Sequence, residues 1–484
     1  MKKLCFALAL LMIAAVFAAC GGKGDTTSAT TPAADITIAE TTTGRYEADL
    51  PERDFGGESI VLYARIYNGV WDACDVLVEE IDGELINDAL YEREDFIENT
   101  YNVKLELVKS GVDNVTTNVK TFIAAGDGSY DAVICSAYNS GAIALEGMLC
   151  DLNGVEYIDF SQPWWSQRTN ESLSIGRKQY YATGDIFIID NKAIRMFFFN
   201  KDMPEQFGLE SPYQLVFDDK WTFEKYIEFN EAVSGDLNGD NQLKREDDRY
   251  GTMAQPSLGI VLYIGAGQQM TSKDGDDIPL AACNSDLAIS IMTGISESIA
   301  GLDAISIDGI ATKSSVYPDN MVYFMEGRVF FAPEVLLHIE SMRGAEIDIG
   351  ILPPPKYNES QEDYYCYTDG YCVNLVSIPV TNTETDKIGF IVEAMSAESM
   401  NNLTPAYYEV ALTNKYVRDA ESVAMLDLIL DASVMDNANV FSWGSIEATL
   451  NSAMSGGKPI ASVVEANIEA LEAAIAKTVD AFVS

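Results

Sequence analysis

The chain has 484 residues, which is more than one small core needs and enough for two lobes of ordinary domain size. Hydrophobic residues make up 48% and charged residues 22%, the composition of a folded globular protein. The 75 acidic residues outnumber the 31 lysines and arginines, and the formal net charge of −44 disfavours binding to nucleic acid or to an anionic membrane surface. Most of these carboxylates are expected only to keep the protein soluble, although an acidic surface also attracts cations.

The N-terminus has the pattern of a bacterial export signal. Lys2 and Lys3 precede an apolar run over 4–16 that is too short to span a bilayer as a permanent helix. The segment Phe17-Ala-Ala-Cys20 resembles a lipobox, so we expect residues 1–19 to be removed and Cys20 to carry a lipid. An ordinary secretory signal with a cleavage site nearby is the alternative.

A tether is expected to follow this signal. Residues 20–54 are rich in Gly, Thr, Ala and Ser and lack apolar periodicity, which is typical of a flexible spacer. We therefore expect an extracytoplasmic protein that is anchored to the cell membrane only through its lipid.

Strand-like and helix-like segments alternate at the start of the body. The pattern predicts a strand at Glu58–Ala64, a helix over 84–99, an alternating strand over 103–107, a helix over 115–123 and a short buried strand at Asp131–Cys135. This β-α-β-α-β order favours a parallel sheet covered by helices, and hence an α/β fold.

Further strands are predicted later in the chain, at Arg195–Phe199, Arg328–Phe331 and Ile347–Leu352. From Ile460 to Phe482, apolar residues recur at steps of three and four, which predicts an amphipathic C-terminal helix. We find no internal repeat and no second long hydrophobic run in the sequence.

Four short segments carry a family resemblance through their order and spacing. They are Phe198–Asp202 (FFNKD), Lys220–Glu224 (KWTFE), Phe324–Ala332 (FMEGRVFFA) and Ile349–Tyr357 (IGILPPPKY). Each segment alone is a weak signal. Together with the lipobox and tether, they resemble the family 1 extracellular solute-binding proteins of bacterial ABC importers, over the whole body from about residue 55 onward.

This resemblance implies an α/β, two-lobed type II periplasmic-binding-protein fold, with the ligand cleft between lobes that are joined by strand crossovers. Lobe one would comprise 55–187 plus 371–432, and lobe two 195–368 plus 435–484. The implied function is that a monomer captures a small soluble nutrient, by family habit an oligosaccharide, for the permease subunits of an ABC importer. The lobes would close around the ligand on their hinge, and the importer would recognise the closed form.

Aromatic residues beside polar ones are a second reason to expect a sugar ligand, since sugar C–H faces stack on rings while the hydroxyls bond polar side chains. The candidate ligand-binding residues are Arg65, Tyr67, Trp71, Trp164, Trp165, Asp185, Asp369, Tyr371 and Trp443. Trp443, Arg65 and Asp185 are favoured, because each is close to an expected strand end or crossover. Any single aromatic residue could instead pack in the core, and a polyol or a peptide remains an alternative ligand.

An acidic segment has the spacing of a twelve-residue calcium loop. Oxygen-bearing groups at positions 1, 3, 5, 7 (a backbone carbonyl) and 12 are those of Asp236, Asn238, Asp240, Gln242 and Asp247. Position six, where such loops prefer Gly, is Asn241, and Asn tolerates a positive φ. Position nine is Lys244, which cannot bind a cation, so a water would have to supply that ligand. We expect a structural Ca²⁺ here, and a solvated acidic turn is the alternative. The Asp at position twelve resembles the dockerin-type loop.

The sequence offers little for catalysis. No cysteine pair has CxxC spacing, and whether Cys366 and Cys372 form a disulfide stays open. His338 is the one histidine, and no GxSxG elbow, Walker A loop or Rossmann glycine pattern occurs. We therefore predict no catalytic residue and no enzyme. The alternatives are a surface-anchored glycoside hydrolase, which needs only two carboxylates, and a non-transporting sensor built on the same fold.

Overall fold

The computed structural model describes residues 45–66, 76–111, 114–307, 319–412 and 419–483. The expected signal peptide, Cys20 and most of the tether lie outside these residues, as do Tyr67 and Trp71. One compact unit begins at Tyr46. Residues 46–54, which lie within the expected tether, therefore belong to the body: the Tyr46 backbone bonds Asn401, and Arg53 pairs with Asp386 at 2.9 Å.

The first sheet has four strands in the order β12-β3-β1-β2. Their bounds are β1 (Glu58–Ile66), β2 (Val103–Gly111), β3 (Ala132–Cys135) and β12 (Leu375–Ser377). β2 and β3 run parallel to β1, with α2 (Leu85–Tyr101) and α3 (Val115–Ala124) as the connections, so the predicted β-α-β-α-β order is confirmed. β12 returns from far along the chain and pairs antiparallel to β3.

The second sheet has five strands in the order β10-β4-β9-β5-β8. They are β4 (Arg195–Asn200), β5 (Tyr250–Ala254), β8 (Ile305–Ile307), β9 (Val329–Val335) and β10 (Ile349–Leu352). β4 is antiparallel to both of its neighbours, whereas β5 is parallel to β8 and β9. Phe197, Phe331 and Trp221 are wholly buried here, so aromatic rings fill much of this core.

Helices and short elements complete the body. The helices are α4 (Ala137–Ala144), α5 (Gln167–Leu173), α6 (Ile189–Lys192), α7 (Asp202–Phe207), α8 (Pro212–Phe217), α9 (Phe223–Val233), α10 (Leu258–Gly265), α11 (Asp286–Gly301), α12 (Asp319–Met325), α13 (Thr385–Ser399), α14 (Leu403–Leu412), α15 (Ala420–Asp431), α16 (Asn437–Val440), α17 (Ile446–Ser455) and α18 (Ile460–Val483). The 3-10 turns are η1 (Leu152–Gly154), η2 (Leu336–Gly344) and η3 (Trp443–Ser445), and the two-stranded sheets pair β6 (Thr271–Lys273) with β7 (Pro279–Ala281) and β11 (Cys366–Tyr367) with β13 (Ser433–Val434).

α18 is the predicted C-terminal amphipathic helix. It buries Ile460, Val464, Leu471 and Phe482, which all belong to the expected apolar stripe. Within the described ranges, no helix is both long and apolar enough to cross a membrane.

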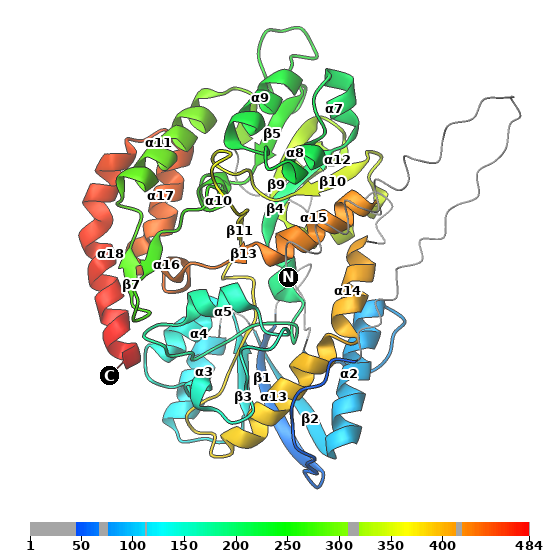
Figure 1. Cartoon of the computed structure of the whole chain (residues 1–484), viewed down its shortest axis with the longest axis vertical. Coiled ribbons are helices and arrows are strands. Elements are labelled where there is room, and N and C mark those ends of the chain that lie inside the picture. The colour runs from blue at the N-terminus through cyan, green and yellow to red at the C-terminus, as the bar shows by residue number, and fades with distance from the viewer. Residues whose placement is uncertain (1–44, 67–75, 112–113, 308–318, 413–418, 484) are drawn as a thin grey trace, which may run out of the picture. The chain divides into compact units, whose positions relative to one another are not determined.

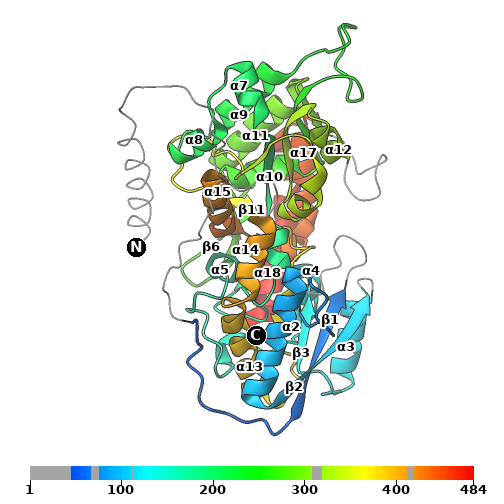
Figure 2. The same cartoon turned by 90° about the vertical axis from the view of Figure 1, so that its right-hand side faces the viewer.

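Three chain segments connect the two sheets (Figures 1 and 2). Ile194, just before β4, bridges Thr368, while β11 pairs with β13 in parallel. These crossovers therefore lie side by side between the sheets. α15, which falls in the range expected for lobe one, packs on β10, and its Ser422 hydroxyl lies 2.8 Å from the Tyr213 hydroxyl.

A buried carboxyl group organises the core beside the first sheet. Trp164 and Trp165 are each 2% exposed, and their indole N–H groups donate to opposite oxygens of Glu393 on α13, both at 3.0 Å. Burial raises the pKa of Glu393 to about 7, although both indole bonds favour the ionised form.

The raised pKa predicts a pH-dependent contribution to stability. Since the folded pKa lies above the ordinary value of 4.5, the contribution is present below that value and is lost as the pH rises through about 7. Between pH 5 and pH 8 the loss should be on the order of 2 kcal/mol in the free energy of unfolding.

Urea unfolding of the wild type and of Glu393→Gln at both pH values measures this contribution. The variant should be less stable at pH 5, because one indole N–H then faces an amide NH₂. Its stability should nevertheless change less with pH, since the amide does not ionise. An equal pH dependence in the two proteins would contradict a titrating Glu393.

Candidate functional site

Polar side chains gather where the carboxyl ends of the first sheet's strands meet the crossovers. Arg65 is next to the last residue of β1, and Ser136 follows β3 and caps α4 by accepting from the Asn139 N–H at 3.3 Å. Parallel strands bring their carboxyl ends to one edge of a sheet, and ligands of open α/β sheets bind outside that edge. A binding site is therefore expected at this edge of the sheet.

Arg65 and Tyr371 form its aromatic part. Arg65 is 3% exposed, and its guanidinium group donates to the Tyr371 carbonyl at 2.9 Å and lies 5.6 Å from the centre of the Tyr371 ring. The Tyr371 ring also lies 6.0 Å from that of Tyr138 on α4. Tyr371 is nevertheless 51% exposed, so this group offers an accessible ring beside a buried cation.

An ion pair joins two crossovers in the same region. Arg195, the first residue of β4, lies 3.0 Å from Asp369, and their side chains are only 12% and 18% exposed. Burial alone would lower the pKa of Arg195, but Asp369 and Glu334 outweigh it and raise this pKa. The other Asp369 oxygen accepts from the Tyr371 N–H at 3.1 Å, which links the ion pair to the exposed ring.

The polar cluster continues onto the second sheet. Glu334, near the end of β9, accepts from Gln255 at 2.6 Å and from Asn320 at 3.0 Å. His338 is buried, with Nε2 3.9 Å from Glu334, and burial lowers its pKa, so this histidine is neutral at pH 7.

Asn439 on α16 connects elements from both sides. Its amide donates to the Tyr138 hydroxyl at 2.7 Å and to Glu447 on α17 at 2.5 Å, and its oxygen accepts from the Gly370 N–H at 3.2 Å. A Cβ on Gly370 would lie 2.5 Å from the Asn439 oxygen, so this approach requires glycine. Glu447 also accepts from the Tyr367 hydroxyl at 2.9 Å, and burial raises its pKa to about 7.

Three of the candidate residues from the sequence come together here: Arg65, Asp369 and Tyr371. The sequence pattern does not single out four further residues of this cluster, namely Arg195, Tyr138, Asn439 and Glu447. A sequence signal existed for Arg195 alone, as a charged residue at the start of an otherwise apolar strand. The others depend on contacts between distant segments; Asn439 and Tyr138, for example, are 301 positions apart.

The remaining described candidates lie in other places. Trp164 and Trp165 are core residues bonded to Glu393. Trp443 is buried, donates to the Thr478 hydroxyl at 2.8 Å and stacks on Phe441 with ring centres 5.2 Å apart. Asp185 accepts from Thr404 at 2.6 Å, and burial raises its pKa to about 6. Each of these side chains makes at least one hydrogen bond within the fold.

The acidic loop brings three carboxylates together. Ligand oxygens of Asp236, Asp240 and Asp248 all lie within 4.8 Å of one another. The third carboxylate is that of Asp248, whereas the spacing predicts Asp247. The two Asp248 oxygens accept from the Leu237 and Lys244 N–H groups at 2.8 Å, and these bonds hold the carboxylate inside the loop.

The backbone of this loop turns at position six, where the sequence places Asn241. Asn241 has a φ of 61° at position six, and Asn238 accepts from the Asp240 N–H at 2.8 Å. The Lys244 ammonium group contacts Asp240 and lowers the pKa of that carboxyl group. The donors are all oxygens, which suits a hard cation such as Ca²⁺.

The described cysteines are all free thiols. Cys366 and Cys372, whose pairing the sequence left open, are both buried and unpaired with each other, and burial raises the pKa of each thiol. Neither therefore acts as a thiolate at neutral pH.

The ion pair at the crossovers gives a test of the site's energetics. Asp369→Asn leaves the Arg195 guanidinium buried without its closest counter-charge. The free energy of unfolding, measured in urea, should therefore fall by about 2 to 3 kcal/mol. The control is Asp276→Asn, in a pair with Arg177 whose side chains are 71% and 83% exposed. This substitution should change the free energy of unfolding by less than about 0.5 kcal/mol. Equal effects of the two substitutions would contradict a special role for the crossover pair.

Comparisons with known proteins show the fold. No protein-family model and no curated protein matches the chain. Among solved structures, an ABC substrate-binding protein of Listeria monocytogenes in complex with cycloalternan matches with a TM-score of 0.55 at 14% identity, over 87% of this chain and 99% of that one. The cyclic α-maltosyl-1,6-maltose binding protein of Arthrobacter globiformis matches with a TM-score of 0.57 at 13% identity, over 87% and 99%.

A third match is an ABC transporter solute-binding protein of Thermotoga lettingae bound with α-D-tagatose, with a TM-score of 0.51 at 13% identity, over 87% of this chain and 100% of that one. All three matches cover nearly the whole of the solved chains, so both sheets and the crossovers are included. The chain therefore has the two-lobed type II periplasmic-binding fold that the family 1 resemblance implies.

Proposed function

We propose that this protein is an extracytoplasmic solute-binding lipoprotein that captures a small soluble sugar, an oligosaccharide, for an ABC importer. The observation that carries the proposal is the polar cluster at the crossovers, where the exposed Tyr371 ring lies beside Arg65, Asp369 and Arg195. Proteins with the same fold bind cycloalternan, cyclic maltosyl-maltose and tagatose. A stacking ring among hydrogen-bonding side chains is what a sugar needs.

Each part of the cluster has a role in this proposal. The Tyr371 ring would stack on a sugar face, and Arg65 and the Asp369–Arg195 pair would bond its hydroxyls. Asn439, which bonds Tyr138 on one side and Glu447 on the other, would keep the crossovers in register while the lobes move. The ligand would be bound and released without chemical change.

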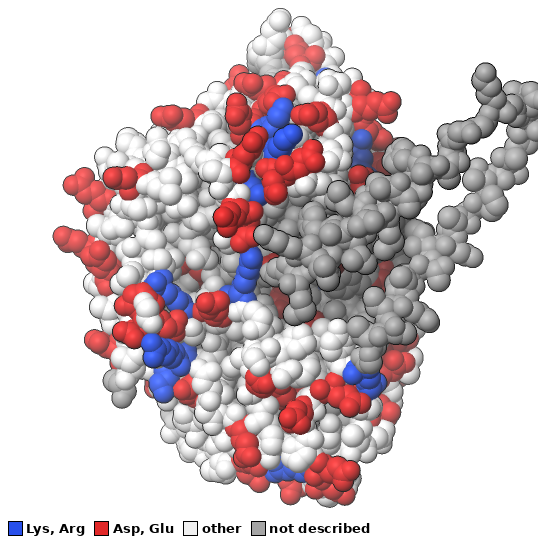
Figure 3. All heavy atoms as spheres, viewed as in Figure 1, with Lys and Arg blue, Asp and Glu red and all other residues white. Residues whose placement is uncertain are grey.

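The cellular role is part of the same proposal. The N-terminal signal with Cys20 supports a lipid anchor, and the permease subunits would recognise the closed protein. Acidic side chains spread over the face drawn in Figure 3, with most lysines and arginines beside them, which supports a soluble body that does not bind nucleic acid. We propose that it acts as a monomer.

Sugar binding predicts a ligand-dependent rise in melting temperature when the purified protein is screened against maltose, maltotetraose, cyclodextrins and tagatose. Tyr371→Ala should lower the affinity for the best ligand about three- to tenfold, because the substitution removes the stacking ring. The control is Tyr46→Ala, whose backbone rather than ring bonds Asn401. Released reducing sugar would indicate a glycoside hydrolase instead, and no shift with any sugar would contradict the proposed ligand class.

We also propose that the loop from Asp236 to Asp248 binds a structural Ca²⁺. Asp236, Asn238, Asp240, the Gln242 carbonyl and Asp248 would hold it, with Asp248 replacing the Asp247 that the spacing predicted. The Lys244 ammonium group, now on Asp240, would have to withdraw as the ion enters.

Removal of calcium should lower the melting temperature, and adding it back should restore the original value. Asp240→Asn should abolish this response, whereas Asp247→Asn should leave it in place. Lys244→Met keeps the aliphatic stem but removes the competing charge, so it should strengthen calcium binding in a titration calorimeter. A calcium-independent melting temperature in the wild type and in Lys244→Met would mean that the loop is only a solvated acidic turn.

A further inference from the structure

A hairpin on the side of the second sheet reaches across to the lobe of the first sheet. β6 and β7 lie between α10 and α11, which follow β5 and precede β8 of the second sheet, and β7 packs on α18. At the base of the hairpin, the buried Asp436 carboxylate of the third crossover accepts from the Met270 N–H at 2.6 Å and from the Thr271 hydroxyl at 2.7 Å. The hairpin is therefore fixed to its own lobe and to a crossover.

The hairpin meets a turn over residues 174–178, which belongs to the first lobe. This turn directly follows α5. Just beyond it, the Gln179 carbonyl accepts from the Leu152 N–H at 2.7 Å, and Ala182 bridges Val376 of β12. The turn is therefore anchored to the first sheet.

Asp277, at the tip of the hairpin, accepts three hydrogen bonds from this turn. Its carboxylate oxygens accept from the Arg177 N–H at 2.8 Å and from the Ser174 hydroxyl at 3.1 Å. Its backbone carbonyl accepts from the Gly176 N–H at 2.8 Å. One residue of the hairpin thus engages both the backbone and a side chain of the opposite lobe.

Lys273 adds a charged contact on the same side of the hairpin. Its ammonium group donates to the carbonyls of Glu171 and Ser174, the second at 2.6 Å, and lies 2.8 Å from the Asp277 carboxylate. The Lys273 and Asp277 side chains are only 21% and 18% exposed. Ionic hydrogen bonds that are shielded from water in this way are stronger than those of exposed pairs.

This contact and the candidate binding site lie on opposite sides of the crossovers. In Figure 2, β6 and α5 are on one side of β11, whereas α4 and β1, which carry Tyr138 and Arg65, are on the other. The crossovers are the hinge of a two-lobed protein, and a rotation about a hinge that brings two parts together on one side separates the parts on the other. Closure of the lobes around the site would therefore pull the hairpin from the turn.

We infer that residues 271–281 and 171–178 form a latch between the lobes, which is intact in the ligand-free protein and is broken when the lobes close on a solute. The inference rests on the proposed solute-binding function. Because binding must first break the bonds of Asp277 and Lys273, only a fraction of the molecules is ready to bind, and the measured affinity is lower by that fraction. The latch thereby favours release of the solute.

Variants of the latch should bind sugar more tightly than the wild type does. Asp277→Asn removes the carboxylate, and Asn tolerates the φ of 64° at this position. Lys273→Met removes the ammonium group and keeps the aliphatic stem. In calorimetric titrations with maltotetraose and with tagatose, each variant should raise the affinity for the sugar that binds about three- to tenfold.

Asp276→Asn is the matched control for these titrations. Asp276 is the neighbour of Asp277 and pairs with Arg177, but the side chains of this pair are 83% and 71% exposed. Such a pair contributes little, so the sugar affinity should stay that of the wild type. Unchanged or weaker sugar binding in both Asp277→Asn and Lys273→Met would overturn the inference.

Hydrogen exchange follows the latch directly. The amides of Gly176 and Arg177 are bonded to Asp277 across the contact, so addition of the sugar should make both exchange faster. Most ligands slow the exchange of the amides that they affect, which makes the sign of this change diagnostic. Slower exchange at both amides would contradict a latch that breaks on binding.

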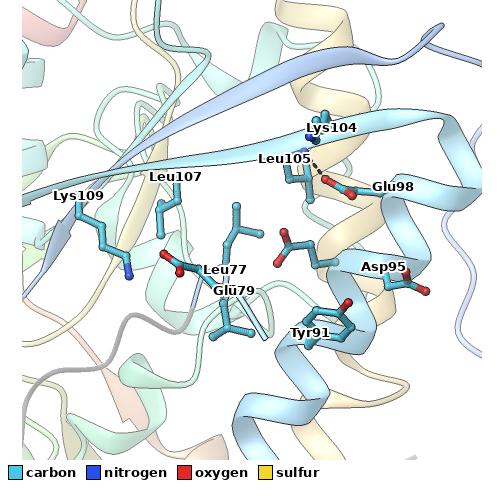
Figure 4. A pocket seen from close by; sticks show the side chains of 11 residues that line it. Leu77, Glu79, Tyr91, Asp95, Glu98, Lys104, Leu105, Leu107 and Lys109 are labelled. Atoms are coloured by element: carbon cyan, nitrogen blue, oxygen red, sulfur yellow. Dashed lines mark hydrogen bonds between the residues drawn. The ribbon is translucent and has the colours of Figure 1, made fainter. Parts of the chain in front are cut away.

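The reference amide for this measurement comes from a pocket of about 400 Å³ in the first lobe (Figure 4). Every residue that lines this pocket comes from α2, β2 or residues 77–79. Within it, the Leu105 N–H donates to Glu98 at 2.7 Å. Donor and acceptor belong to one lobe, so exchange at Leu105 should not change when the lobes move.

Small-angle scattering of the ligand-free protein separates a failure of the latch from a failure of the proposed function. Asp277→Asn should lower the radius of gyration, because more molecules adopt the closed arrangement, whereas Asp276→Asn should not. The wild-type radius in both Asp277→Asn and Lys273→Met would overturn the latch. A smaller radius in a protein that binds no sugar would support the latch and count against the sugar alone.

Discussion

The ion pair between Arg195 and Asp369 is the contact on which the candidate site depends. It joins the start of β4 to the segment after β11, two crossovers that are 174 positions apart, and Asp369 also fixes the Tyr371 backbone. Since both charges are largely withdrawn from water, removing either one leaves the other buried without its closest counter-charge. The position of the exposed Tyr371 ring therefore follows from a charge balance that only the folded crossovers create.

Much of the fold was predictable because it is encoded locally. Alternating residues such as Val103 and Leu105 predicted the edge strand, and the three-to-four spacing from Ile460 predicted α18. The site was not encoded in this way, because Tyr138, Gly370 and Asn439 meet only after the two sheets have formed. Periodicity reports which face of an element is buried, but not which distant element covers it.

The tryptophans show why residue type alone does not identify a binding surface. A Trp in a sugar site leaves its face open, whereas Trp164 and Trp165 lie in the core and direct both indole N–H groups to Glu393. The same indole that can stack on a ligand is also the largest apolar group available to a core. What decides between these roles is the partner of the N–H group, and that partner comes from α13, more than 220 positions away.

The carboxylates of this acidic chain fall into distinct physical environments. Asp369 is balanced by Arg195, the loop carboxylates of Asp236 and Asp240 converge at the surface, and Glu393 and Glu447 are buried with pKa values of about 7. The buried groups are therefore partly protonated at neutral pH, and the formal charge of −44 overstates the charge of the folded protein. Net charge consequently describes the surface of this molecule well, while its sites are defined by the few carboxylates that the fold withdraws from water or brings together.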